Sequence, residues 1–387
     1  MTSIFDVIII GAGPAGLSAA LHVLKSREKP SVLLVDKITP WERPIACAEG
    51  VWREPFDAVV DVKPQWIRFP ISKAVLHSPD QTSIAYFEKN KGCIINRALM
   101  QADIARECAA LGAEVRCNCK VADVGEERDG QRTVRFFDGQ EARCKAVIDA
   151  SGPISGFGKR EKMHWKPLDL EPAYFAVADN VSLSSDEVHV YLGGKLAPGG
   201  YAWAFPRENG IANVGIVVGK SSLGSVNIRE LLAAFLRRDF PQANVLKYFA
   251  GTIPCEAGKN SMGSGRLLKA GDAASTINPI SRAGIVEAMV SGGLAGDFAV
   301  RMLSAKKNKE ITALHRDYCD AWRLTIGKAH CKLARAKGAL LKVPDADYNN
   351  AFKVLRDIAP DKLPMSKIIG LSLGRFPRLV WAVRHLM

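Results

Sequence analysis

A strand, a glycine-rich turn and a helix follow one another at the start of the chain and constrain its fold more than any other feature. The run at residues 6–10 is apolar and β-branched, a turn with the spacing Gly-x-Gly-x-x-Gly follows at once, and residues 17–25 have a helical pattern. A second apolar strand, residues 31–35, ends at Asp36, twenty positions after the last glycine of the turn. This order is typical of the first βαβ unit of a Rossmann-type domain that binds a dinucleotide.

Each glycine of this turn has its own physical task in that interpretation. Gly11 permits the tight turn, Gly13 lets backbone N–H groups approach a pyrophosphate, and Gly16 allows the helix to pack closely. The positive end of the helix then faces the phosphates, and the Asp36 carboxylate accepts hydrogen bonds from a ribose hydroxyl. A lone glycine motif would be a weak signal, but here both strands, the helix and the terminal acid agree.

The composition indicates a well-packed protein of a reducing compartment. The chain has 387 residues, 48% of them hydrophobic, which suits two or three sub-domains with a sizeable core. Its nine cysteines are odd in number and form no Cys-x-x-Cys pair, and no His or Cys cluster supports a metal site at Cys117 and Cys119. The start has no basic segment, and the apolar stretch 7–24 is already explained as strand and helix. We therefore expect a cytoplasmic protein without a signal peptide or a transmembrane span.

Positive charge is concentrated toward the C-terminus. Of a net charge of +13, residues 301–387 carry most, with 18 Lys and Arg against 7 Asp and Glu. Residues 368–387 mix Trp, Phe and Leu with Arg and contain no acid, so they fit either a peripheral contact with the anionic inner face of a membrane or a basic helix packed on the protein. A nucleic-acid partner is not expected, because no binding motif is recognised and aromatic residues are too sparse for a stacking platform.

The pattern of the remaining residues predicts an α/β protein, α+β overall. It also predicts a second sheet, which is antiparallel. Helix and strand patterns alternate over residues 98–149, and several short strands separated by Gly and Pro occupy residues 172–218. We expect a discontinuous Rossmann-type nucleotide-binding domain, an inserted antiparallel-sheet domain for the substrate, and a mostly helical, basic C-terminal region. Their predicted bounds are 1–72, 92–165 and 256–303 for the first, 73–91 and 166–255 for the second, and 304–387 for the third.

A second glycine-rich segment completes the predicted cofactor site. A short apolar strand at residues 266–270 leads into a Gly-Asp turn and then into a helix, and the residues expected at the cofactor there are Gly271, Asp272, Gly284 and Ile285. The acid can hold ribityl or ribose hydroxyls, and N–H groups at the helix start can stabilise the negative charge of a reduced flavin ring. Together with Arg97, these residues resemble the FAD site of the p-hydroxybenzoate hydroxylase superfamily over roughly residues 1–300.

A segment of alternating aromatic residues narrows the resemblance from the superfamily to one family within it. Tyr201, Trp203 and Phe205 project from one face of an extended strand, so they form either a broad apolar wall for a substrate or the packed core of a sheet. The full segment 198–206 is similar to the Pro-x-x-Tyr-x-Trp-x-Phe-Pro signature of geranylgeranyl reductases, and the loop at 44–50 resembles the Cys-Ala/Gly-Glu-Gly loop of the archaeal-type members. The chain therefore resembles the geranylgeranyl reductase family, and within it the archaeal-type digeranylgeranylglycerophospholipid reductases.

This resemblance implies an FAD enzyme that saturates C=C bonds in the isoprenoid chains of lipids or prenyl precursors. An isolated alkene has no carbonyl to accept charge, so hydride from the reduced flavin needs a nearly concerted proton. By resemblance, Cys47 is the proton donor, and Glu49 is the competing candidate. The aromatic wall would bind the isoprenoid chain, and each buried methylene would contribute ~0.8 kcal/mol of binding free energy. The resemblance also places further residues at the cofactor, namely Ala15, Lys37, Cys47, Ala48, Gly50 and Val121.

The electron donor and two other functions stay open at this point. Many hydroxylases of the superfamily carry Asp-Gly where this chain has Ser151-Gly152, so the donor is either NADPH or reduced ferredoxin, which a basic surface could dock. An FAD-dependent monooxygenase or halogenase of the same fold is the first alternative, although the halogenase motif Trp-x-Trp-x-Ile-Pro is not evident. A non-catalytic carrier of prenyl lipid or flavin is the second.

Overall fold

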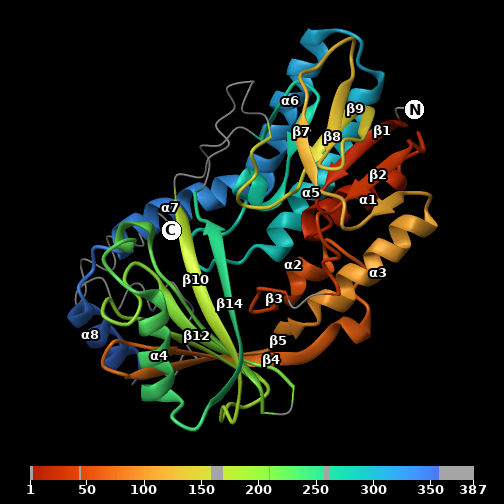
Figure 1. Ribbon diagram of the computed structural model, residues 1–387. Coiled ribbons are helices and arrows are strands. Elements are labelled where there is room, and N and C mark those ends of the chain that lie inside the picture. Colours follow the sequence, from red (N-terminus) through yellow and green to blue (C-terminus); the bar gives the residue numbers. More distant parts are fainter. Residues whose placement is uncertain (1–2, 43–44, 158–168, 209, 257–261, 357–387) are drawn as a thin grey trace. The chain divides into compact units, whose positions relative to one another are not determined.

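The computed structural model describes residues 3–42, 45–157, 169–208, 210–256 and 262–356, which fall into two compact units. Unit 1 comprises Met1–Ile45, Arg97–Leu168 and Pro254–Cys331, and unit 2 comprises Ala46–Asn96, Asp169–Ile253 and Lys332–Met387. Figure 1 labels many of the elements of both units. Each unit has its own sheet.

Unit 1 contains the predicted Rossmann-type sheet. Its strands run in the order β15-β16-β9-β1-β2-β6, and β1 is parallel to both β2 and β9. β16 is parallel to β9 and β6 is parallel to β2, whereas β7 and β8 form an antiparallel extension beside β9. The bounds are β1 Ser3–Ile10, β2 Val32–Val35, β6 Glu114–Arg116, β7 Val121–Val124, β8 Arg132–Phe136, β9 Glu141–Asp149, β15 Gly263–Ser264 and β16 Leu267–Lys269.

The helices of unit 1 pack closely through small residues. Helix α1 lies against α5, where a Cβ on Gly292 would come within 2.1 Å of the Ala15 carbonyl oxygen, and one on Gly296 within 2.6 Å of the Ala19 carbonyl oxygen. Larger side chains on α5 would therefore separate the two helices. The bounds are α1 Pro14–Leu24, α3 Arg97–Ala110, the 3-10 turn η4 Gly271–Ala274, α5 Ile285–Ser304, α6 Asn308–Trp322, the π-helical turn η5 Arg323–Gly327, and α7 Lys328–Leu340, which continues into unit 2.

Unit 2 contains the second sheet, with strand order β14-β10-β13-β12-β11-β4-β5-β3. The pairs β10–β13, β12–β13, β11–β12 and β4–β5 are antiparallel, as predicted. The pair β3–β5, which was not predicted, is also antiparallel, and β4 with β11 is a parallel pair. Residues 46–72 group with this sheet rather than with the nucleotide-binding domain, because β3 and β4 pair with β5. The bounds are β3 Gly50–Trp52, β4 Ile67–His77, β5 Ser83–Ile95, β10 Leu170–Asp179, β11 Glu187–Tyr191, β12 Tyr201–Pro206, β13 Ala212–Val217 and β14 Asn244–Pro254.

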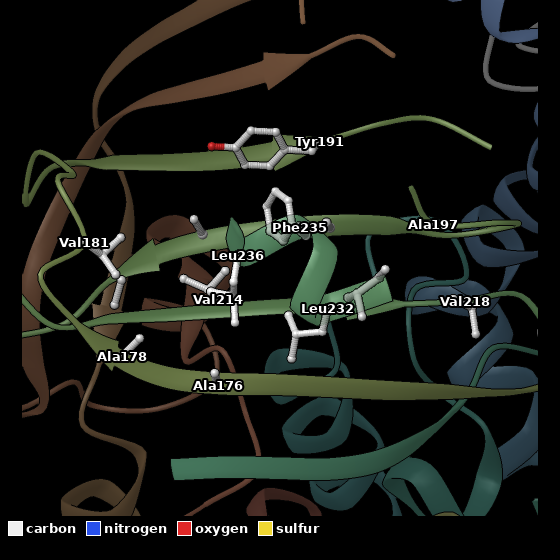
Figure 2. Packing of buried hydrophobic residues seen from close by; sticks show 14 residues of the cluster. Ala176, Ala178, Val181, Tyr191, Ala197, Val214, Val218, Leu232, Phe235 and Leu236 are labelled. Atoms are coloured by element: carbon white, nitrogen blue, oxygen red, sulfur yellow. The ribbon is translucent and has the colours of Figure 1, made fainter. Parts of the chain in front are cut away.

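One face of the second sheet is covered by helix α4, Ile228–Asp239. Leu232 and Phe235 of this helix pack among buried side chains of the strands (Figure 2). Ala202 and Ala204 of β12 belong to the same cluster, so β12 presents small side chains to the helix. Its aromatic side chains consequently project from the opposite face, as the alternation predicted.

The remaining elements are short or helical. They are α2 Arg53–Asp57, η1 Pro64–Trp66, η3 Lys220–Ser222 and α8 Asp345–Arg356. Among the residues described here, no helix combines the length and the apolar character needed to cross a membrane. The basic segment 368–387 lies outside the described residues.

Candidate functional site

The glycine-rich turn of unit 1 has the geometry that a pyrophosphate site requires. Gly11 has a φ of +104°, and a Cβ there would lie 2.3 Å from the Ala150 carbonyl oxygen. A Cβ on Gly16 would lie 1.8 Å from the Gly11 oxygen, so both positions exclude a side chain. At Gly13, by contrast, a Cβ would meet no described atom within 4 Å, and no described side chain caps the start of α1. Open space beside an uncapped helix start fits a phosphate group.

Asp36 directly follows β2, and its carboxylate is engaged by the backbone. Oδ2 accepts a hydrogen bond from the Ala12 N–H at 2.8 Å, and Oδ1 accepts one from the Ile38 N–H at 3.0 Å. Each carboxylate oxygen can accept a second hydrogen bond, so both retain lone pairs for a ribose hydroxyl. Asp36 therefore holds the glycine turn in shape in addition to any contact with a cofactor.

Arg97 is linked to the same turn through Gln101, a residue that the sequence motifs did not predict. Its Nε donates to Oε1 of Gln101 at 2.8 Å, and Nε2 of Gln101 donates to the Ala12 carbonyl oxygen at 3.2 Å. Gln101 is 1% exposed and lies one helical turn after Arg97 on α3. The i,i+4 spacing was the available signal, because it places both side chains on one helix face.

Asp272 interacts electrostatically with Arg97. Burial raises the pKa of Asp272, and the Arg97 charge opposes that rise. Burial also raises the pKa of Glu287, in the first turn of α5, and Asp272 adds to the effect. Gly271 has a φ of +61°, and a Cβ there would lie 2.8 Å from the Ala15 Cβ, so the two glycine-rich turns abut. We call this group the cofactor cluster: Gly11, Gly13, Ala15, Gly16, Asp36, Arg97, Gly271 and Asp272.

The other predicted cofactor residues of unit 1 have mixed surroundings. Gly284 precedes α5 with no capping bond from a described side chain, so N–H groups at this helix start suit a flavin. Ile285 and Val121 are buried, whereas Lys37 is exposed. The Val121 side chain belongs to the apolar core of unit 1, which leaves its backbone for a cofactor.

A buried ion pair lies at the carboxyl ends of β9 and β16. Nζ of Lys269 is 3.3 Å from Oδ2 of Asp149, and both side chains are 0% exposed. The Ser151 hydroxyl donates to Oδ1 of Asp149 at 2.6 Å, and the Ser155 hydroxyl donates to Oδ2. The serine that departs from the hydroxylase pattern therefore has a structural partner. Removing either charge would leave the other buried and unpaired, so the pair fixes both strand ends.

In unit 2, residues 46–50 form a loop that hydrogen bonds hold in place, and we call it the Cys47 loop. Cys47 is half-buried, and the Glu49 N–H donates to its Sγ at 3.3 Å. Glu49 has a φ of +64°, a left-handed conformation that is uncommon for a residue with a Cβ. Its carbonyl oxygen accepts a hydrogen bond from the Ile95 N–H of β5 at 2.9 Å. The surrounding structure therefore imposes this conformation on the loop.

The Glu49 side chain is an ion-pair partner. Its Oε2 lies 2.7 Å from Nη2 of Arg207, and the Glu49 side chain is 4% exposed. Burial lowers the pKa of Arg68, the Glu49 charge opposes that shift, and the Arg207 charge adds to it. Glu49 thus acts as a hydrogen-bond acceptor beside two guanidinium groups.

The three aromatic side chains of β12 differ in exposure. Trp203 is 6% exposed and belongs to a buried cluster, whereas Tyr201 and Phe205 are half-buried at its edge. A Cβ built on Gly50 would lie 3.0 Å from the Phe205 ring, so the Cys47 loop rests on this aromatic face. Trp203 therefore contributes to the sheet core, while Tyr201 and Phe205 retain exposed aromatic surface.

Asn213 of β13 connects the aromatic strand to the Cys47 loop. Its Oδ1 accepts a hydrogen bond from Nε1 of Trp203 at 2.9 Å, and its Nδ2 donates to the Cys47 carbonyl oxygen at 2.9 Å. The sequence motifs predicted neither Asn213 nor Arg207. Arg207 continues the odd-numbered alternation of β12, and Asn213 is the one polar residue in the run 212–217. We call this group the aromatic cluster: Cys47, Glu49, Trp203, Phe205, Arg207 and Asn213.

Two protein families match successive parts of the chain. The lycopene cyclase protein family matches residues 6–165, which include the glycine-rich turn. The geranylgeranyl reductase catalytic domain matches residues 169–253, which include β12 and β13.

Proteins that are similar over nearly their whole length carry names from one family. Digeranylgeranylglycerophospholipid reductase 2 of Methanococcoides burtonii is 32% identical, with 98% of this chain and 95% of that protein covered. The digeranylgeranylglycerophospholipid reductase of Methanosarcina mazei is 29% identical, with 99% of this chain and 96% of that protein covered. In fold, the chain is similar to a geranylgeranyl bacteriochlorophyll reductase-like protein of Thermoplasma acidophilum, with a TM-score of 0.88, 22% identity and 100% of both chains covered. The resemblance in the sequence motifs is thereby confirmed, and the chain belongs to the geranylgeranyl reductase family.

Proposed function

We propose that this chain is an FAD-dependent reductase that saturates C=C bonds in geranylgeranyl or related isoprenoid chains of lipids or prenyl precursors. Family membership supports the reaction class, and the names of the relatives support a geranylgeranyl lipid as the substrate. The observation that carries the proposal is the hydrogen-bonded contact between the Cys47 loop and the aromatic strand within unit 2. It links the Cys47 peptide, through Asn213, to the strand that carries the apolar rings, and a thiol close to an apolar surface is the pairing that proton transfer to an alkene in an oily chain requires.

The cofactor cluster fits FAD in its chemistry. Open space at Gly13 and the uncapped start of α1 suit the pyrophosphate, and Asp36 and Asp272 offer carboxylates for hydroxyl groups. The start of α5 at Gly284 offers N–H groups to the flavin ring. When it is bound and reduced, FAD supplies the hydride equivalent for alkene reduction.

Cys47 is the proposed proton donor, and Glu49 is the less suitable candidate. The Glu49 carboxylate accepts from Arg207, so in this arrangement it holds the loop rather than a transferable proton. The Glu49 N–H lies 3.3 Å from the Cys47 sulfur and would stabilise the thiolate that remains after proton transfer. Water then returns a proton to the thiolate, and the enzyme is ready for the next bond.

Tyr201 and Phe205 are the proposed contacts for the isoprenoid chain. Their half-buried rings keep apolar surface, and each methylene buried there would contribute ~0.8 kcal/mol. Either NADPH or reduced ferredoxin remains the proposed electron donor. A peripheral membrane contact through residues 368–387 is proposed from composition alone.

Anaerobic turnover tests the reductase proposal. Purified protein is loaded with FAD, reduced chemically with dithionite and given a geranylgeranyl lipid, and the lipid is analysed by mass spectrometry. We expect a gain of two hydrogens for each reduced bond. A monooxygenase or halogenase would leave the lipid unchanged without oxygen, and a carrier would bind it without oxidising the reduced FAD. Parallel reactions with NADPH and with reduced ferredoxin identify the donor.

A further inference from the structure

A single buried amide serves both the aromatic strand and the Cys47 loop. Asn213 accepts from the Trp203 indole and donates to the Cys47 carbonyl oxygen, each at 2.9 Å. We propose that Asn213 is a positioning residue, which holds the Cys47 thiol in register with the aromatic face and thereby sets the rate of proton donation. The inference rests on the proposed reductase function and adds a residue to its machinery.

The orientation of the Asn213 amide follows from the chemistry of its partners. An indole N–H can only donate and a peptide carbonyl can only accept, so one of the two amide orientations satisfies both contacts. Asn213 is 1% exposed, which leaves water little access to replace either bond. Each hydrogen bond therefore specifies where its partner lies.

The register of β12 and β13 allows the indole to reach this amide. Trp203 pairs with Gly215, and Phe205 pairs with Asn213, so the indole must cross the strand diagonally. A Cβ on Gly215 would lie 2.2 Å from Cζ2 of the indole. Glycine is thus what leaves room for the ring, and the geometry depends on Trp203, Gly215 and Asn213 together.

The contacts described for the Cys47 loop hold it at two different positions. Arg207 and the Ile95 N–H hold Glu49, two residues beyond the thiol. Asn213 holds the peptide of Cys47 itself. Loss of the Asn213 contact should therefore release Cys47 while Glu49 stays anchored. This local effect differs from a general loss of stability.

The first experiment measures the reactivity of the Cys47 thiol without any turnover. Asn213→Leu removes both hydrogen bonds, and Val214→Ala is the matched control, since Val214 is a buried neighbour on β13 that packs on the α4 side. Iodoacetamide alkylation of Cys47 is followed by peptide mass spectrometry and divided by that of the half-buried Cys319. We expect Asn213→Leu to raise this ratio about five- to tenfold, the factor that corresponds to one lost hydrogen bond. The control should leave it unchanged.

Steady-state kinetics supply the second readout. For Asn213→Leu we expect kcat for prenyl reduction to fall about ten- to hundredfold, as for a misplaced catalytic group, with KM changed less than about threefold. Asn213→Asp is the second variant, for use if the leucine variant fails to fold. It keeps the acceptor for Trp203 but turns an oxygen toward the Cys47 carbonyl oxygen, so it should show both the raised alkylation ratio and the lowered kcat.

An unchanged Cys47 alkylation ratio in a folded Asn213 variant overturns the positioning role, whatever happens to kcat. A raised ratio in Val214→Ala as well would also overturn it, because the effect would then be general. If wild-type protein reduces no prenyl lipid but the alkylation ratio shifts as expected, the reductase proposal fails and the hold of Asn213 on Cys47 stands.

Discussion

The cofactor cluster of unit 1 and the aromatic cluster of unit 2 are built in different ways. The first depends on backbone geometry, since Gly11 and Gly16 exclude side chains and Asp36 bonds to backbone N–H groups. The second depends on side chains from distant segments, because Asn213 reaches Cys47 across 166 positions and Arg207 reaches Glu49 across 158. Backbone rules act over a few residues, whereas side-chain partners are selected by the whole fold. Local motifs therefore reveal every residue of the cofactor cluster, but only four of the six residues of the aromatic cluster.

The ion pair Asp149–Lys269 of unit 1 and the ion pair Glu49–Arg207 of unit 2 differ in how far they are buried. In unit 1 the pair Asp149–Lys269 is completely buried, with two serine hydroxyls on the carboxylate. In unit 2 Glu49 is buried, but its partner Arg207 keeps 24% of its side chain exposed. Water can solvate the charge of Arg207 if its ion pair breaks, but it cannot solvate the buried charge of Lys269 or Asp149. We expect the free energy of unfolding to fall more when Asp149–Lys269 is broken than when Glu49–Arg207 is broken.

The largest effect is expected at Cys47, in the aromatic cluster. Cys47→Ala should lower the rate of prenyl reduction by ~10² to 10⁴, the usual contribution of one positioned acid. The flavin should still bind and accept electrons, because the cofactor cluster is untouched. Single-turnover reduction and flavin absorbance measure the two effects, with Cys319→Ala as the control. Near-wild-type turnover in Cys47→Ala would mean that Glu49 or water, rather than Cys47, donates the proton.

The next effect is expected at the buried ion pair of unit 1. Lys269→Ala should lower the free energy of unfolding by ~3 to 5 kcal/mol, because Asp149 is left buried and unpaired. Lys145→Ala is the control, since its pair with Asp6 at 2.9 Å has side chains 47% and 28% exposed. That loss should stay below ~1 kcal/mol. Urea unfolding compares the two, and equal losses would refute the assigned importance of the buried pair.

A smaller effect separates core from substrate surface on β12. Trp203→Phe should lower the free energy of unfolding by ~1 to 3 kcal/mol, because Oδ1 of Asn213 is left without its donor. Phe205→Leu breaks no such bond and removes half-exposed aromatic surface, so it should raise KM for long prenyl substrates and change the melting temperature little. Thermal melts and prenyl-binding titrations of both variants show which ring belongs to the core and which contacts the substrate. The reverse pattern would mean that Phe205 is core and Trp203 is the substrate contact.

The smallest effect is expected at Gly13 in the cofactor cluster. Gly13→Ala should raise Kd for FAD about tenfold, or ~1.4 kcal/mol, because the methyl group enters the space that a phosphate would use. The apoprotein should keep its melting temperature, since a Cβ there meets no described atom within 4 Å. Gly16→Ala is the contrasting control, because its Cβ would collide with the Gly11 oxygen and destabilise the apoprotein itself. Unchanged FAD affinity in Gly13→Ala would place the pyrophosphate elsewhere.

Several elements were predictable because their signals are local. The apolar run before Gly11 forms β1. The helix after it, α1, packs closely against α5 because both helices carry small residues where they meet. The odd-even alternation over 201–205 set the faces of β12 correctly. The same alternation did not distinguish the buried Trp203 from the half-exposed Phe205, because that difference depends on which strands and loops cover each ring.

By itself, the sequence determined the nucleotide-binding unit, the aromatic strand and the family, because glycine spacing and strand alternation follow rules of backbone geometry that hold within a few residues. The tertiary structure alone decided that Asn213 would hold Cys47, that Arg207 would pair with Glu49, and that Lys269 would be buried against Asp149. No local pattern names such partners. A buried polar group must find its complement wherever the fold brings one, and the cost of leaving it unpaired makes the pairing specific.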